Sequence, residues 1–313
     1  MKTQPIENLL PQEIDPELKV ILKGLSLALS EIVNFGTHIL SWDLEFKRNI
    51  KDSNIPTVFL RNILELADAI AILIAKSSID SSKILLRSLL ENSFSLMYLI
   101  EKDEINRVHA FLVCRANKDI RYYKQFIKEE QTSKSFVNKI KKQEPDFEIN
   151  NICNPEEIKN VLKAKIELLE EPIYKDVQKE YTRTCNKKEK KNNNPNWYSL
   201  YNGPENFEQL SEHLQYTIIY EFHYRKYSEN VHINNVLKGF VKSGYETADI
   251  IQIRDFQDCR EVCFNSINLL LDLYKEFIIK RIPHKDKEFQ DWAIKFEKLF
   301  EQIYEATKFK YKK

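Results

Sequence analysis

The feature that most constrains this chain is a series of long stretches whose apolar residues recur every three or four positions. The first stretch runs from Pro16 to about Arg48, and its apolar residues are Leu18, Ile21, Leu22, Leu25, Leu29, Ile32 and Val33. This spacing places the side chains on one face of an α-helix, so it predicts a long amphipathic helix. Gly36 is a candidate position for that helix to bend or end.

Further helices are predicted by the same spacing of apolar residues. Pro56 suits the first turn of a second helix that runs to about Lys76. Asp80, Ser81 and Ser82 are N-cap candidates for the next helix, and the short loop predicts that these two helices pack antiparallel. The expected helices after the second cover residues 82–101, 102–129, 214–231, 245–282 and 286–309.

Turn-forming residues are scarce. The 313 residues include only five glycines and ten prolines, against 42% hydrophobic residues. A sandwich or barrel of many short strands needs more turn signals than this. The predicted fold class is therefore all-α, a multi-helix bundle of long antiparallel helices that forms a single domain over residues 1–313.

One part of the chain has a different composition. Residues 131–213 are rich in Lys, Glu and Asn and have weaker periodicity, so we expect a loop-rich insertion with short helices. Within it, residues 183–196 are basic and polar and are expected to be a mobile loop. That loop is either solvated or in contact with phosphates, and the solvated interpretation is favoured. Trp197, Tyr198 and Tyr201 are expected to anchor the chain after it.

Charge and cysteine content exclude several classes of protein. The 48 basic and 47 acidic side chains leave a net charge of +1, which provides no global field to hold a nucleic acid. The five cysteines are scattered, which favours a reducing cytoplasm over a disulfide framework or a zinc cluster. The first residues lack a secretory signal, and the longest apolar run, Ala69 to Ala75, is too short to span a membrane. We expect a cytoplasmic protein without membrane contact.

The predicted helix over 82–101 carries an ionic pair in apolar surroundings. Arg87 and Glu91 lie one turn apart, while most of the remaining helix surface is apolar. An ion pair removed from water is weak evidence for stability, so another reason for it is needed. In the structural interpretation, the pair fixes how neighbouring helices pack, or it reaches solvent at the rim of the bundle. In the functional interpretation, Glu91 orients Arg87 towards a polar cavity.

A second polar stripe lies in "YEFHYRKYSENVH". Arg225 and His232 are seven residues apart and share a helix face if the helix is unbroken, with Glu221 and Ser228 on the same line. An arginine can bind a phosphate by two hydrogen bonds, and a histidine can move a proton near neutral pH. The alternative is surface charge or helix capping.

Other catalytic groups are not apparent. The remaining histidines are expected to be packing or surface residues, and they are His38, His109, His213, His223 and His284. The chain also lacks a G-x-G-x-x-G, Walker A, H-E-x-x-H or G-x-S-x-G motif. No cofactor and no metal are therefore expected.

Three segments carry a resemblance to a known family. "LLRSLLENSFSLMYLI", "NWYSLYNGPENFEQLSEHL" and "YRKYSENVH" resemble the bacterial domain-of-unknown-function 5677 family. That pattern has an R-S-L-L-E core helix, a tryptophan-containing segment and a helix ending in Y-x-x-x-S-x-x-x-H. The matching positions are Arg87, Glu91, Trp197, Tyr224, Ser228 and His232. The family name implies no activity.

A looser similarity is to the HEPN group of helical bundles, which is common in toxin and anti-phage systems. Many of its members are metal-independent ribonucleases with an Arg-x4-6-His motif, and "RKYSENVH" has that spacing. The similarity implies that Arg225 binds the scissile phosphate and that His232 acts as acid or base for attack by the ribose 2′-hydroxyl. Arg87, Glu91, Glu221, Tyr224 and Ser228 would support this site. It also implies a homodimer, because such sites are usually formed across one.

The functional hypothesis is a helical bacterial defence-associated protein that acts as a HEPN-like, metal-independent endoribonuclease. Its expected partners are RNA, a partner protein of the defence system and a second copy of the chain. The alternative is a non-catalytic helical module that serves as an interaction surface, a sensor or an antitoxin.

Overall fold

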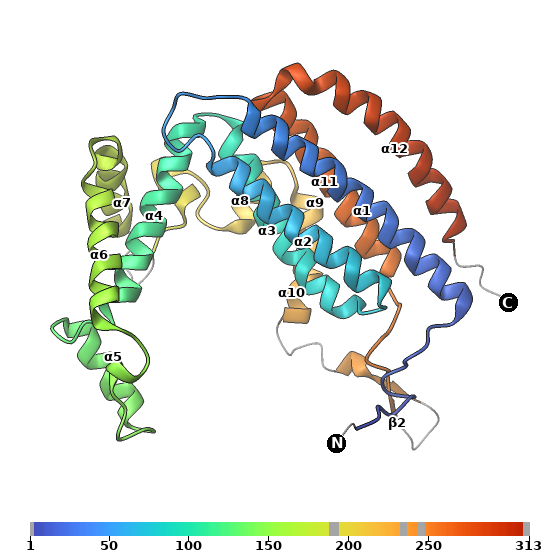
Figure 1. The fold of residues 1–313 in the computed structure, drawn as a ribbon, viewed down its shortest axis with the longest axis horizontal. Coiled ribbons are helices and arrows are strands. Elements are labelled where there is room, and N and C mark those ends of the chain that lie inside the picture. Colours follow the sequence, from blue (N-terminus) through green and yellow to red (C-terminus); the bar gives the residue numbers. More distant parts are fainter. Residues whose placement is uncertain (1–2, 188–193, 232–236, 243–247, 309–313) are drawn as a thin grey trace. The chain divides into compact units, whose positions relative to one another are not determined.

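The computed structural model describes residues 3–187, 194–231, 237–242 and 248–308. The chain forms two compact units, each with its own internal contacts. The first unit contains residues 1–102 and 211–313, and the second contains residues 103–210. Figure 1 shows the helices of both units, which are described separately below.

Four long helices form the core of the first unit. They are α1 (Pro16–Glu45), α2 (Ile55–Ala75), α3 (Ile79–Glu101) and α11 (Cys259–Arg281). α1 and α3 each pack against both α2 and α11, so the four helices enclose a common apolar core. α12 (Asp286–Ala306) packs along α1 and α11 after the short turn η6 (Pro283–Lys285). The all-α prediction is confirmed, and α1, α2, α3 and α12 lie close to their predicted boundaries.

Gly36 does not end α1, because the helix continues to Glu45. Its place in the fold is a close approach between helices. A Cβ atom added at Gly36 would overlap the Tyr274 hydroxyl and a methyl group of Leu64. The missing side chain therefore lets α11 and α2 approach α1 at this level.

The start of the predicted helix over 245–282 is wrong. α11 begins only at Cys259, and the described residues before it form strand β2 (Ala248–Ile250) and a loop. β2 pairs antiparallel with β1 (Phe240–Lys242). Two further backbone hydrogen bonds hold the residues after β2, from Ile251 N to Gly239 O at 2.9 Å and from Ile253 N to Leu9 O at 2.8 Å. Long-range backbone pairing thus overrides the helical spacing of the apolar residues.

The predicted helix over 214–231 has an interruption. It consists of α9 (Thr217–Ile219), the π-helical turn η4 (Tyr220–Tyr224) and α10 (Arg225–Val231). The segment follows α8 (Phe207–His213), which spans the boundary between the two units. α10 packs against α3.

The second unit is built on α4 (Glu104–Lys124), which packs against α6 (Pro155–Glu170) and α7 (Lys175–Lys187). Its shorter elements are α5 (Gln131–Lys141), η1 (Ile149–Asn151), η2 (Pro172–Tyr174) and η3 (Trp197–Asn202). A separate apolar core holds it together, made of Ala110, Val113, Tyr174, Val177, Tyr181 and Leu200. The unit therefore starts earlier than the predicted insertion, because α4 packs on α6 and α7.

Two sequence predictions concern the end of α7. The helix includes residues 183–187, the first part of the predicted basic loop. Residues 188–193 of that loop lie outside the described residues. After them, the Trp197 ring packs edge-on against the Phe111 ring, with centroids 6.1 Å apart, as the predicted anchoring role of Trp197 requires.

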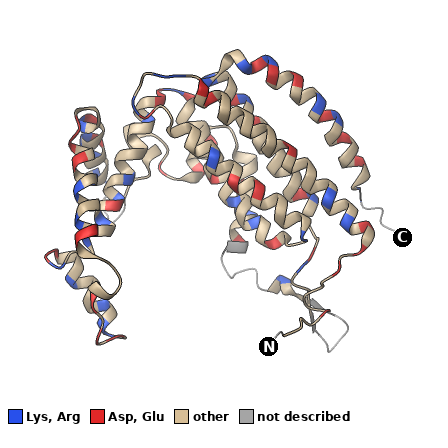
Figure 2. Cartoon of the chain, viewed as in Figure 1, with Lys and Arg blue, Asp and Glu red and all other residues tan. Residues whose placement is uncertain are grey.

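Charged residues of both signs are interspersed along the helices, as Figure 2 shows for α12. This distribution matches the near-zero net charge. Among the described residues, none of the helices combines the length and apolar character needed to cross a bilayer.

Candidate functional site

The first polar stripe of the sequence, on α3, contacts Tyr224 and one residue of the second stripe, Ser228, on the η4–α10 segment. The Arg87 Nε donates a hydrogen bond to the Ser228 hydroxyl at 2.9 Å. The Arg87 Nη2 donates to the Tyr224 hydroxyl at 2.8 Å and lies 3.1 Å from the Glu91 carboxylate. We call Arg87, Glu91, Tyr224 and Ser228 the Arg87 cluster. Four residues that the sequence predicted for a site are thus brought together.

Tyr224 connects the charges of this cluster. Its hydroxyl donates to Glu91 Oε1 at 2.7 Å while it accepts from Arg87. Burial, and then the hydrogen bond to Glu91, raises the pKa of Tyr224 to about 12. The hydroxyl therefore keeps its proton at neutral pH. The Arg87 guanidinium also lies over the Tyr224 ring, 4.8 Å from its centroid, which adds a cation–π contact.

Arg87 has its donors directed at protein groups. Only 22% of its side chain is exposed, against 36% for Glu91. A guanidinium that binds Ser228, Tyr224 and Glu91 would have to give up these bonds before it could hold a substrate. The geometry of the Arg87 cluster is that of a tie which fixes α10 on α3.

α10 is fastened on its other side to α11. The Lys226 Nζ lies 2.9 Å from both oxygens of Glu261, and the Tyr227 hydroxyl donates to the same carboxylate at 3.0 Å. His223 Nδ1 is 3.8 Å from it. The approach of His223, followed by Lys226 and Tyr227, lowers the pKa of Glu261 to about 2. Glu261 is therefore a fixed negative charge.

A buried lysine extends this polar line along α3. Lys83 lies one turn before Arg87, and its Nζ is 2.8 Å from Asp80 and 2.9 Å from Asp258. Burial by itself would lower the pKa of Lys83, but the hydrogen bonds to Asp80 and Asp258 outweigh it and raise the pKa. Asp258 precedes the first turn of α11, so this contact ties the start of α11 to α3.

Arg225 lies apart from the Arg87 cluster. Its Nε is 3.3 Å from Glu221, one turn earlier, and 54% of its side chain is exposed. Its guanidinium lies 5.4 Å from the centroid of the Tyr220 ring. Ser228 turns towards α3, so it does not share the exposed face of Glu221 and Arg225.

His232, the predicted partner of Arg225, lies outside the described residues. α10 is helical from Arg225 to Val231, the residue before it. The condition of an unbroken helix is therefore met up to that point.

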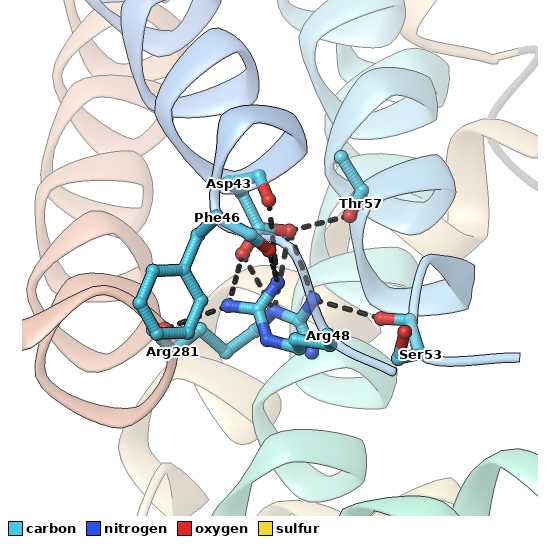
Figure 3. A network of polar contacts seen from close by, with 6 residues as sticks. All are labelled: Asp43, Phe46, Arg48, Ser53, Thr57 and Arg281. Atoms are coloured by element: carbon cyan, nitrogen blue, oxygen red, sulfur yellow. Dashed lines mark hydrogen bonds and ion pairs between the residues drawn. The ribbon is translucent and has the colours of Figure 1, made fainter. Parts of the chain in front are cut away.

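The most buried ionic network lies elsewhere, at the ends of α1 and α11 (Figure 3). Asp43 is completely buried and binds two arginines, with Arg281 Nη2 at 2.9 Å and Arg48 Nη2 at 2.7 Å. The Thr57 hydroxyl donates to the same carboxylate. Arg281 also donates to the Ser53 carbonyl at 2.9 Å. Because substrate has no access to a carboxylate with no exposed surface, this network has a structural role.

Sequence reasoning missed a small pocket beside the η4 turn. It has a volume of about 210 Å³, and its lining residues are Leu90, Ile219, His223, Asn265, Asn268, Leu269 and Asp272. His223 was expected to be a packing or surface residue. The signal that could have singled it out is tertiary, because its neighbour Asn265 lies 42 positions away in the sequence.

Metal ligands do not gather in the part of the chain that the structure describes. No group of three or more His, Cys, Asp or Glu side chains is placed there to hold an ion. The polar clusters above are instead built from hydrogen bonds and ion pairs between side chains.

Comparison with known proteins gives one match. A family model described as a family of unknown function (DUF5677) matches residues 53–247, more than half of the chain. The chain belongs to the DUF5677 family. The DUF5677 match spans α2, α3 and the η4–α10 segment, and so includes all of the Arg87 cluster. It ends before α11, which supplies Glu261 and four of the pocket residues. No curated protein and no solved structure matches the chain.

Proposed function

We propose that this protein is a metal-independent endoribonuclease of a bacterial defence system, with Arg225 and His232 as its catalytic residues. The observation that carries the proposal is the exposure of Arg225. Of the two arginines in the polar stripes, Arg87 is held between α3 and α10, whereas 54% of the Arg225 side chain is open to solvent. A guanidinium that binds a phosphate must be accessible in this way.

The proposed reaction uses the ribose 2′-hydroxyl as nucleophile. Arg225 exchanges its contact with Glu221 for a phosphate and stabilises the charge that develops there. The 2′-oxygen forms a bond to phosphorus and loses its proton to a histidine, while the bond to the 5′-oxygen breaks and that oxygen gains a proton. The products are a 2′,3′-cyclic phosphate and a 5′-hydroxyl. In a homodimer, His232 of each subunit would supply one of the two proton transfers.

The test compares two matched arginines. Arg225→Ala is expected to lower the rate of cleavage of a single-stranded RNA by about 100-fold or more. Arg61→Ala is the control, because Arg61 is also exposed and forms an i, i+4 ion pair, with Glu65. The control should cleave at the wild-type rate, and His232→Ala should lose activity as Arg225→Ala does. Cleavage that is undiminished in both Arg225→Ala and His232→Ala would exclude the proposed roles.

A second candidate function is a non-catalytic interaction module. Ile218 is 73% exposed and Phe222 is 69% exposed, beside the exposed pair Glu221 and Arg225 on the same helical segment. Contiguous exposed apolar side chains with polar residues at their rim mark protein interaction sites, and Ile218 and Phe222 lie one helical turn apart. Phe222→Ser should then weaken self-association or partner binding in sedimentation experiments. An active, monomeric ribonuclease whose assembly is unchanged by Phe222→Ser would contradict this second candidate.

A further inference from the structure

The pocket beside η4 has the size of a small organic ring. Its volume of about 210 Å³ lies between α3, the α9–η4 segment and α11 of the first unit. This equals the volume of about seven water molecules at ~30 Å³ each. A pyrimidine base, with about eight non-hydrogen atoms, is close to that size, whereas most drug-sized ligands need larger pockets.

The residues that line the pocket are of two kinds. Leu90 and Leu269 are buried and, like Ile219, they offer apolar surface to the flat face of a ring. His223, Asn265, Asn268 and Asp272 are polar and can bind the hydrogen-bonding edge of the same ring.

The polar lining residues retain hydrogen-bonding capacity. Asn265 Nδ2 lies 3.1 Å from His223 Nδ1, and which of the two atoms donates depends on the tautomer of the His223 ring. Asp272 receives one long hydrogen bond, from the Tyr216 hydroxyl at 3.5 Å. Within the described residues the Asn268 amide has no hydrogen-bond partner. An imidazole, a carboxylate and an amide thus line the pocket and can bind a ligand.

The backbone gives an independent reason to place a site here. His223 lies within the π-helical turn Tyr220–Tyr224. Such turns are rare in proteins and occur frequently at functional sites. In this turn, His223 faces Asn265 on α11 while the next residue, Tyr224, faces Arg87 on α3.

We propose that this pocket binds a pyrimidine base. Asp272 accepts a hydrogen bond from the exocyclic amine or ring N–H, and His223 and Asn268 donate to a ring carbonyl. The base belongs either to a free nucleoside or to an unpaired nucleotide of RNA, and proteins read unpaired bases by such edge contacts. The inference rests on the proposed function only for the second of these sources.

The first experiment measures binding of cytidine, uridine, adenosine and guanosine to the full chain by calorimetry. Cytidine or uridine should bind at least about tenfold more tightly than the purine nucleosides. Asn268→Ala and Asp272→Asn should each weaken that binding about tenfold. Asp291→Asn is the matched control, because it makes the same type of change on the exposed surface of α12. Thermal unfolding of each variant checks that the fold is retained.

A second arm distinguishes the source of the base. An all-adenosine RNA is compared with the same RNA carrying one cytidine, both with their 2′-hydroxyls replaced to prevent cleavage. If the cytidine-containing RNA binds more tightly and Asn268→Ala removes the difference, the pocket binds a base within RNA. If the nucleoside binds but the cytidine in RNA adds no affinity, the ligand is a free nucleoside. If neither nucleosides nor RNAs show a pyrimidine preference that depends on Asn268 and Asp272, the inference is overturned. Pyrimidine binding by a protein that never cleaves RNA would refute the proposed function and leave the pocket assignment intact.

Discussion

Asp43 carries more ionic contacts than any side chain in the predicted stripes. Its carboxylate has no exposed surface and binds Arg48, Arg281 and Thr57 together (Figure 3). Buried ion pairs are weak evidence for net stability, since both partners lose hydration. Removal of one partner is different, because the other charge then remains buried without compensation.

Asp43→Asn is therefore expected to lower the free energy of unfolding by about 3–5 kcal/mol. The reason is that Arg281, with 1% of its side chain exposed, would lose its counterion. Urea denaturation measures the change. Asp68→Asn, at an exposed position of α2, should change stability by less than about 0.5 kcal/mol. Equal stability of the two variants would show that Asp43 is not the counterion of this network.

The lowered pKa of Glu261 predicts that the stability of the protein depends on pH. Its pKa falls from 4.5 to about 2 on folding, so the folded state binds the proton more weakly than the unfolded chain. The stability that results is fully present above pH 4.5 and is lost as the pH falls towards 2. Its magnitude is limited by solvent screening, since 32% of the side chain is exposed.

Glu261→Gln should accordingly flatten the acid side of the stability curve. Denaturation at pH 7, 4 and 3 is expected to show a smaller loss of stability in the variant than in the wild type. Glu297→Gln, an exposed carboxylate on α12, should keep the wild-type profile. A wild-type profile in Glu261→Gln would mean that its ion pair with Lys226 does not form in solution.

At the scale of helices, α1 contains two glycines in different surroundings. A Cβ at Gly36 would overlap Tyr274 and Leu64, whereas a Cβ at Gly24 would meet Thr307 and Ile303 only at 3.9 and 4.0 Å. Helix propensity alone favours alanine at both positions by about 1 kcal/mol. Packing decides the outcome at Gly36, and propensity decides it at Gly24.

Gly36→Ala is expected to destabilise the protein by about 1–3 kcal/mol, because the added methyl group overpacks the contact of α1 with α11 and α2. Gly24→Ala should instead stabilise it by up to about 1 kcal/mol. The two variants carry the same substitution at different positions of one helix. Thermal unfolding measures whether each one raises or lowers the stability of the protein. Stabilisation by both would contradict the close approach at Gly36.

At the scale of the whole molecule, each compact unit has its own apolar core. Tyr174, with 1% of its surface exposed, lies in the core of the second unit and packs edge-on against His109. The core of the first unit lies among α1, α2, α3 and α11. Local stability is therefore expected to respond to mutation unit by unit.

Tyr174→Ala should cost the second unit about 3–5 kcal/mol through the cavity it leaves. Hydrogen exchange should become faster in α4 and α7, while amides of α1 and α2 keep their protection. Tyr122→Ala is the control, because 56% of Tyr122 is exposed in the same unit. Loss of protection throughout the chain would show that the two units unfold together.

Most helices could be predicted from the sequence, because helical hydrogen bonds are local and the spacing of apolar residues reports them directly. Arg87 and Glu91 were identified in the same way, as an ionic pair one turn apart on an apolar helix. The residues of β2 and those that follow it escaped this reasoning, since β2 pairs with β1 and Ile253 takes its backbone partner from Leu9, far away along the chain. The π-helical turn at Tyr220–Tyr224 escaped it as well, because such turns are rare and the apolar spacing favours a regular α-helix.

By itself, the sequence determined that the chain is helical and which helices carry costly polar groups, since both follow from neighbours within a few positions. Only the tertiary structure decided what those groups bind, and it alone revealed the buried pair of Asp43 and Arg281. Arg87 meets Tyr224 across 137 positions, and Asp43 meets Arg281 across 238. Such partners are chosen by the packing of whole helices, which turns Ser228 towards α3 and leaves Arg225, three residues earlier, more than half exposed.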